Sequence, residues 1–282
     1  PETLPEAIRA DLRSGVIDRV LVIGQGTAAV AGQSMARTLG QQLASSAVRV
    51  QALPATELSG FSLGSDMSNT LIVAISQSGT TTDTNRTVDL VRARGARVIA
   101  IVNRRSSDLT DKSDGVLYTS DGRDVEMSVA STKAFYSQIA AGFLLAAAIA
   151  QEVLVDGEGA HDRSDMLAGL RDIPTAMEAT LAMRDVVAEA ARELAPSRRY
   201  WALVGSGANR IAAEEIRIKL SELCYKAIPS DAIEDKKHID LSSEPLILVC
   251  AAGLIGSNAD DVAKEVAIYR AHKAMNITTT TE

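Results

Sequence analysis

Uninterrupted apolar runs dominate the pattern of the first half of the chain. The clearest are residues 20–23, 71–75 and 98–102, with shorter candidates at residues 48–50 and 116–118. A run without polar alternation indicates a strand that is covered on both faces, as in a parallel sheet. Predicted helices at residues 28–43 and 83–94 separate the strands, and residues 132–154 predict a long closing helix. This order predicts βαβ units in a doubly wound, flavodoxin-like or Rossmann-like α/β sheet.

The same pattern begins again after a glycine-containing stretch at residues 156–159. Residues 200–207 are similar to residues 20–26, and residues 246–253 are similar to residues 72–79. We therefore predict two tandem copies of one α/β unit, at residues 1–157 and 158–282. The last residues, 277–281, match only the strand at 98–102, so we expect the second copy to be incomplete at its C-terminus and the chain to be part of a longer protein.

The composition narrows the class of protein. Apolar residues make up 46% of the 282 residues and aromatic residues 3%, so two cores built from Ala, Val, Leu and Ile are expected. The formal net charge of −7 argues against a nucleic-acid partner, because phosphate backbones require basic surfaces. The most apolar stretch, residues 139–154, is shorter than the about 20 residues of a membrane span, so it predicts a core helix and no membrane association.

The two cysteines, Cys224 and Cys250, form no Cys-x-x-Cys pair. Together with three histidines they make a poor metal site, so no metal is expected. A reduced, cytoplasmic setting is expected, because disulfides are rare in that compartment.

A hydroxyl-rich loop at residues 76–81, Ser-Gln-Ser-Gly-Thr-Thr, joins a predicted buried strand to a predicted helix. The first N–H groups of a helix are unpaired and partly positive, so a phosphate can bind there. Hydroxyl groups add donors, and Gly79 allows close approach of the backbone. The loop lacks the lysine of a nucleotide P-loop. The pattern is typical of a phosphate site, although a simple Ser/Thr-rich helix cap has the same composition.

Two related turns differ from this loop. The turn at residues 24–27, Gly-Gln-Gly-Thr, lacks the third glycine of a dinucleotide-binding turn because Ala29 stands there. In the second copy, residues 250–253 read Cys-Ala-Ala-Gly, so the hydroxyl groups occur only in the first copy. We therefore predict one phosphate site, in the first copy.

Three stretches, residues 76–84, 113–118 and 129–135, resemble the sugar isomerase (SIS) family. The resemblance is to the isomerase half of the glutamine–fructose-6-phosphate aminotransferases, also called glucosamine-6-phosphate synthases. It implies that each copy is an SIS domain, that the first binds a phosphorylated hexose, and that the second supplies catalytic side chains. It implies no cofactor. The substrate-binding residues carried over from the resemblance are Thr27, Ser76, Gln77, Ser78, Thr81, Val129 and Ser131.

The second copy contains the family's Lys-x-x-Glu pattern as Lys219 and Glu222, and His238 follows at the family's spacing. By resemblance, Glu222 moves a proton between C1 and C2, Lys219 supports the oxygens of the open-chain sugar, and His238 assists ring opening from a neighbouring subunit. A homodimer is therefore expected. Without the resemblance, Lys219 and Glu222 form an ordinary surface ion pair, and His238 belongs to a solvated charged loop.

The chain departs from the family at several positions. Thr80 stands in place of a usual Glu, Gln25 in place of Cys, and Ile239-Asp240 in place of the Gly-Pro that follows the histidine. The family's glutaminase domain and C-terminal lysine are not in this sequence, and a glutaminase domain is expected in the full-length protein.

Three functions fit these patterns. The first is the isomerase domain of a glucosamine-6-phosphate synthase, which converts fructose 6-phosphate and ammonia to glucosamine 6-phosphate. The second is a stand-alone SIS amino-sugar-phosphate deaminase/isomerase. The third is a non-catalytic module that senses a phosphosugar, and the retention of Glu222 and His238 at the family's spacing argues against it.

Overall fold

The computed structural model describes residues 2–120, 126, 130–154, 160–238 and 241–280. The chain divides into two compact units, residues 1–171 and 172–282. The predicted boundary at residues 157 and 158 lies outside the described residues. Each unit is an α/β unit with its own parallel sheet, as the apolar runs predict.

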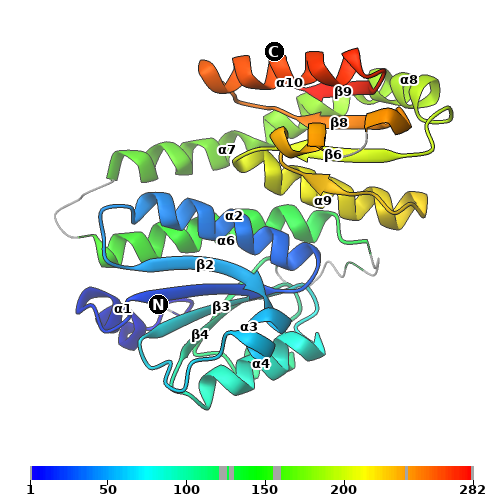
Figure 1. Ribbon diagram of the computed structural model, residues 1–282. Helices are drawn as coiled ribbons and strands as arrows, with labels where there is room; N and C mark the ends of the chain where they lie inside the picture. The colour runs from blue at the N-terminus through cyan, green and yellow to red at the C-terminus, as the bar shows by residue number, and fades with distance from the viewer. Residues whose placement is uncertain (1, 121–125, 127–129, 155–159, 239–240, 281–282) are drawn as a thin grey trace. The chain divides into compact units, whose positions relative to one another are not determined.

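The first unit contains a five-stranded parallel sheet in the order β2-β1-β3-β4-β5 (Figure 1). Its strands are β1 (Arg19–Gly24), β2 (Arg49–Pro54), β3 (Thr70–Ser76), β4 (Arg97–Val102) and β5 (Gly115–Tyr118). The strand order reverses between β1 and β3, which are hydrogen-bonded neighbours. Ligands of open α/β sheets bind at the carboxyl ends of the strands at such a point. The turn after β1 and the loop after β3 both lie there.

Helices cover both faces of this sheet. One face packs against α1 (Glu6–Arg13), α2 (Thr27–Gln42) and α6 (Lys133–Val153), and the other against α3 (Ala55–Phe61), α4 (Thr82–Arg92) and α5 (Asp108–Asp111). Alternate residues of a strand point to opposite faces. In β1, Val22 therefore joins the core under α2 and α6, while Leu21 joins the core on the α3 and α4 side. Both side chains are buried, which explains the uninterrupted apolar run.

Helix α6 is long and apolar enough to cross a membrane by length and composition, and half of its apolar window is buried. A core helix of a soluble protein passes the same test. Leu145 and Ile149 of α6 are buried in the same core as α2. A Cβ added at Gly142 would lie 3.1 Å from Cβ of Met35, so α6 approaches α2 closely at this glycine. We therefore assign α6 to the core of the first unit, as the sequence predicts.

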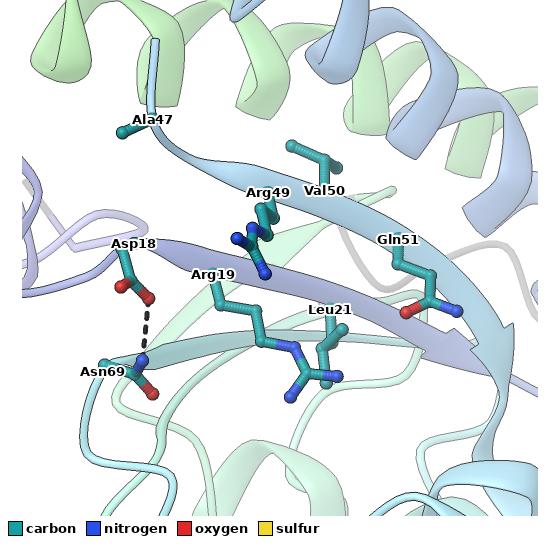
Figure 2. A pocket seen from close by; sticks show the side chains of 8 residues that line it. All are labelled: Asp18, Arg19, Leu21, Ala47, Arg49, Val50, Gln51 and Asn69. Carbon is teal, nitrogen blue, oxygen red and sulfur yellow. Dashed lines mark hydrogen bonds between the residues drawn. The ribbon is translucent and has the colours of Figure 1, made fainter.

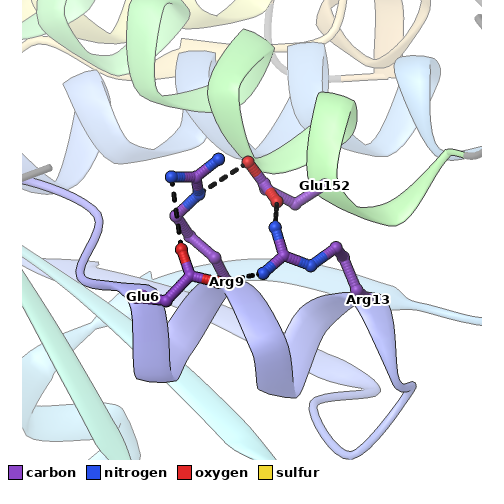
Figure 3. A network of polar contacts seen from close by, with 4 residues as sticks. All are labelled: Glu6, Arg9, Arg13 and Glu152. Atoms are coloured by element: carbon purple, nitrogen blue, oxygen red, sulfur yellow. Dashed lines mark hydrogen bonds and ion pairs between the residues drawn. The ribbon is translucent and has the colours of Figure 1, made fainter.

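An ion-pair network connects α1 to the C-terminal end of α6 (Figure 3). The carboxylate of Glu152, whose side chain is only 10% exposed, accepts hydrogen bonds from Arg9 Nε at 2.8 Å and Arg13 Nη1 at 2.6 Å. Glu6 pairs with both arginines from the other side, and its hydrogen bond raises the pKa of Arg13. The network holds α1 over the core of the first unit.

The second unit repeats the strand order of the first. Its parallel sheet has the order β7-β6-β8-β9, formed by β6 (Trp201–Gly205), β7 (Ser230–Asp231), β8 (Leu246–Cys250) and β9 (Met275–Thr279). This matches β2-β1-β3-β4, which confirms that the fold class is repeated. Among the residues that the structure describes, no strand of this sheet lies beyond β9.

The remaining elements are helices. They are α7 (Ala160–Ala182), α8 (Arg184–Leu194), α9 (Ala208–Cys224), α10 (Ser257–Ala271) and the 3-10 helices η1 (Glu234–His238) and η2 (Leu241–Ser243).

Candidate active site

The loop at residues 76–81 follows β3 directly and precedes α4, as predicted. Ser76 is buried, and its Oγ accepts a hydrogen bond from the Gly79 amide at 3.0 Å and lies 3.4 Å from Thr81 Oγ1. The exposed Thr80 amide donates to Ser78 Oγ at 3.2 Å. The loop therefore gathers three predicted phosphate contacts, Ser76, Ser78 and Thr81, around one tight turn.

The same loop lies at the N-terminus of α4. Thr81 is the N-cap residue of this helix, and its side chain makes no capping hydrogen bond to it. The helix dipole is positive at this end, and the first amides have no partner within the helix. Hydroxyl donors and a helix N-terminus at one point suit a dianionic phosphate group.

Neighbouring segments hold the loop in place. Asn85, buried in the first turn of α4, donates through Nδ2 to the carbonyls of Gly79 at 3.0 Å and Thr81 at 3.1 Å. The Leu109 amide donates to the Gly79 carbonyl at 3.1 Å. Sequence reasoning missed Asn85, because a polar residue inside a helix normally faces solvent and only the fold turns it toward the loop.

Gln77 reaches a second segment of the site. Its Nε2 donates to the backbone carbonyl of Glu126 at 2.9 Å. The Glu126 carboxylate accepts from the amides of Thr132 at 2.5 Å and Ala134 at 2.8 Å, and from Thr132 Oγ1 at 2.9 Å. A carboxylate at a helix N-terminus is stabilised by the helix dipole. Glu126 thus connects Gln77 to the start of α6, and no local motif predicts it because it lies six residues before Thr132.

Ser131 lies beside this helix start. Within the described part of the chain its Oγ is buried and has no hydrogen-bond partner. A buried hydroxyl normally has one, so Ser131 is suited to a polar group of a ligand. Val129, the other predicted sugar contact, lies outside the described residues.

Thr27 is the first residue of α2 and follows the turn after β1. A Cβ added at Gly24 in this turn would lie 2.8 Å from the carbonyl carbon of Ala28, so the chain needs glycine there. Because β1 and β3 are neighbours, this turn and the 76–81 loop lie at the same edge of the sheet.

The predicted catalytic pair lies on α9 in the second unit. Lys219 Nζ is 3.0 Å from Glu222 Oε2 and 3.6 Å from Glu215 Oε1. The exposed fractions of the Lys219, Glu222 and Glu215 side chains are 17%, 37% and 8%. Lys219 therefore contacts two carboxylates, the buried one of Glu215 and the more exposed one of Glu222. Glu215 was missed, although its i,i+4 spacing to Lys219 is a usable signal.

His238 is the last residue of η1, and its side chain lies outside what the structure describes. Tyr269 on α10 anchors the start of this segment, because its hydroxyl donates to the Ile233 carbonyl. Burial, and then the charges of Glu265, Glu234 and Asp231, raise the pKa of Tyr269, so it remains a protonated donor.

In the second unit, the turn after β8 corresponds to the 76–81 loop. Asn209 of α9 donates through Nδ2 to the Ala252 carbonyl at 2.9 Å and accepts from the Ala252 amide at 3.1 Å. Burial raises the pKa of the Cys250 thiol, which keeps it un-ionised. Residues 250–253 of this turn, Cys-Ala-Ala-Gly, carry none of the hydroxyl groups of the 76–81 loop.

Comparisons with known proteins agree with this architecture. The sequence pattern of the SIS domain matches residues 16–148. A glutamine–fructose-6-phosphate aminotransferase of Streptomyces coelicolor is 40% identical over 183 residues, covering 64% of this chain and 29% of the relative. The Corynebacterium glutamicum enzyme is 33% identical over 229 residues, covering 81% and 35%. The chain thus spans about a third of the length of these curated relatives.

Solved structures share the fold. The C-terminal domain of glucosamine-fructose-6-phosphate aminotransferase from Francisella tularensis superposes with a TM-score of 0.82 at 21% identity, covering 96% of this chain and 73% of that chain. A glucosamine-6-phosphate deaminase from Thermotoga maritima gives 0.73 at 17% identity, covering 97% and 79%. The family match shows that residues 16–148 of this chain are a domain of the SIS family, and the solved structures share the fold of nearly the whole chain.

Proposed function

We propose that this chain is the isomerase part of a glutamine–fructose-6-phosphate aminotransferase, which converts fructose 6-phosphate and ammonia to glucosamine 6-phosphate. The observation that carries the proposal is the hydroxyl-lined loop at the N-terminus of α4, on the switch-point edge of the first sheet. Identity of 33–40% to aminotransferases over much of the chain supports this reaction over other phosphosugar chemistry.

The first unit binds the substrate in this proposal. Ser76, Ser78 and Thr81 donate hydroxyl hydrogens to the phosphate, and the amides at the start of α4 compensate its charge. Gln77 and Thr27 also contact the phosphate group in this proposal. Val129 and Ser131 contact the sugar, and the unpaired Ser131 hydroxyl supports that role.

The second unit supplies the acid–base groups. The isomerisation removes a proton from one carbon of the open-chain sugar and returns it to the neighbouring carbon, so it needs one carboxylate close to both. Glu222 takes this role, being the accessible carboxylate of its cluster. Lys219 is held between Glu215 and Glu222, where its ammonium group stabilises negative charge on the sugar oxygen. His238 assists ring opening, donated by the second subunit of a homodimer.

The rest of the reaction needs ammonia. The aligned part of this chain covers only 29–35% of the curated relatives, and their names specify glutamine as the nitrogen source. We propose that the whole protein carries a glutaminase domain that delivers ammonia, in a cytoplasmic enzyme. Given ammonium salts instead, this chain should form glucosamine 6-phosphate by itself.

The decisive experiment follows proton exchange at C1 of fructose 6-phosphate by NMR in heavy water. Wild type should exchange this proton, and Glu222→Gln should exchange it at least about 100-fold more slowly while binding the sugar phosphate normally. Glu214→Gln, which changes another ion-paired acid of α9, is the matched control and should exchange at the wild-type rate. Normal exchange in Glu222→Gln contradicts its role, and binding without exchange in wild type identifies a phosphosugar sensor.

A further inference from the structure

A hollow of about 830 Å³ lies at the opposite, amino-terminal edge of the first sheet (Figure 2). Arg19, Leu21, Arg49 and Gln51 line it from β1 and β2, and Asp18 and Asn69 line it from the segments before β1 and β3. The volume is within the range of small-molecule sites. The 76–81 loop follows the carboxyl end of β3 in the same sheet, so the hollow is separate from it.

Arg19 of β1 and Arg49 of β2 lie side by side on neighbouring strands. They are register partners in the parallel β1–β2 ladder, so their Cα atoms are about 4.8 Å apart and their side chains leave the same face of the sheet. Two like charges on neighbouring positions of one sheet face repel each other. This arrangement lowers the stability of the chain unless an anion compensates it.

The described part of the chain offers these two arginines no compensating ion pair. Arg97, which begins β4 in the same way, pairs with Asp11 at 3.3 Å. Within the described residues, neither the Arg19 nor the Arg49 side chain has a hydrogen-bond or ion-pair partner. Asp18, the carboxylate among the lining residues, instead accepts a hydrogen bond from Asn69 Nδ2 at 2.7 Å, as Figure 2 shows.

From this geometry we propose that the hollow is a binding site for a small ligand with a diphosphate group. Two adjacent guanidinium groups present paired N–H donors that match phosphate oxygens. A diphosphate, with two linked anionic groups, suits two cations on neighbouring strands better than a single carboxylate does. Gln51, which lines the hollow from β2, can then hydrogen-bond the body of the ligand. The site goes beyond the proposed reaction, which does not use it.

Inorganic pyrophosphate is the probe. Pyrophosphate is added to the full chain while NMR follows the Nε–Hε signals of Arg19 and Arg49, which are assigned with Arg→Gln variants. The titration uses the Ser78→Ala variant, because this substitution should weaken anion binding at the 76–81 loop. Both signals should shift together and saturate. Arg19→Gln/Arg49→Gln should weaken this binding at least about 10-fold. The matched control Arg37→Gln, an exposed arginine on α2, should change it less than about two-fold.

Three outcomes would overturn the site. The first is a change in the Arg19 and Arg49 signals that grows linearly with pyrophosphate concentration, or an equal change in the Arg37 signal. Either result indicates only ionic screening. The second is citrate binding as tightly as pyrophosphate, which contradicts the diphosphate class. The third comes from Asp18→Asn, which removes a negative charge from the rim and should strengthen binding several-fold; unchanged or weaker binding would place the anion elsewhere. The single and double variants of Arg19 and Arg49 should fold, because removing one or both charges relieves the repulsion between them.

Discussion

Gly79 packs directly against Ser107. Its φ is +67°, and a Cβ at this position would overlap Ser107 Oγ and lie 2.6 Å from Ser107 Cβ. Ser107, the N-cap residue of α5, is itself held in place: its amide donates to Thr110 Oγ1 at 2.9 Å, and that hydroxyl donates to the Ser107 carbonyl at 2.6 Å. The loop at residues 76–81 therefore takes its shape from a contact with a residue 28 positions further along the chain.

This contact predicts that Gly79→Ala costs about 3 kcal/mol of folding free energy, from positive-φ strain and steric overlap together. Gly253→Ala is the matched control: it is the corresponding glycine of the second copy, has a φ of +68°, and has nothing within 4 Å of an added Cβ. It should cost about 1 kcal/mol, from backbone strain alone. Urea denaturation measures both, and equal costs would mean that Ser107 yields without penalty.

Ser78→Ala should weaken fructose 6-phosphate binding about 10-fold, because a hydrogen bond to a charged group contributes about 1.5–3 kcal/mol. Binding of unphosphorylated fructose should not change. Calorimetric titration of both sugars tests this. Ser59→Ala, which removes an exposed hydroxyl from α3, serves as the control. An equal loss for both sugars would show that Ser78 does not bind the phosphate.

Glu126→Gln should lower the free energy of unfolding by about 1 kcal/mol, because an amide cannot accept all the hydrogen bonds at the N-terminus of α6 or complement its dipole. Hydrogen exchange of the Thr132 and Ala134 amides should become faster in the same variant. Glu189→Gln, at an exposed position of α8, should change neither quantity. Unaltered exchange at Thr132 would contradict the capping role.

Tyr269→Phe should alter how stability depends on pH. Burial raises the pKa of Tyr269 in the folded chain, while an unfolded tyrosine ionises near pH 10. The stability that the tyrosine contributes is therefore complete below about pH 10 and is lost as the pH rises toward the folded pKa. At pH 8, Tyr269→Phe should lower the free energy of unfolding by about 1 kcal/mol, because the hydrogen bond to the Ile233 carbonyl is lost. Between pH 10 and 11 the substitution should lower it by less.

Urea denaturation at several pH values between 8 and 11 measures this difference. Wild type and Tyr269→Phe should approach each other in stability as the pH rises. Curves that remain parallel over the whole range would show that Tyr269 ionises equally in the folded and unfolded chains.

The elements of the first unit could be predicted well where burial is uniform. The runs at residues 71–75 and 98–102 became β3 and β4, because both faces of these central strands are covered. The weaker run at residues 48–50 became the longer β2, at residues Arg49–Pro54. This is an edge strand with a half-exposed, alternating burial pattern, so its hydrophobic signal is short.

The chain's own sequence determined the α/β class, its repetition, the hydroxyl-rich loop and the Lys219–Glu222 spacing, because these follow from local periodicity and from residue types. Only the tertiary structure decided which side chains support them. Asn85 and Glu126 act through contacts that carry no distinctive local pattern. Strand pairing likewise brought Arg19 beside Arg49, because register joins residues that are remote in the chain and no local pattern encodes it.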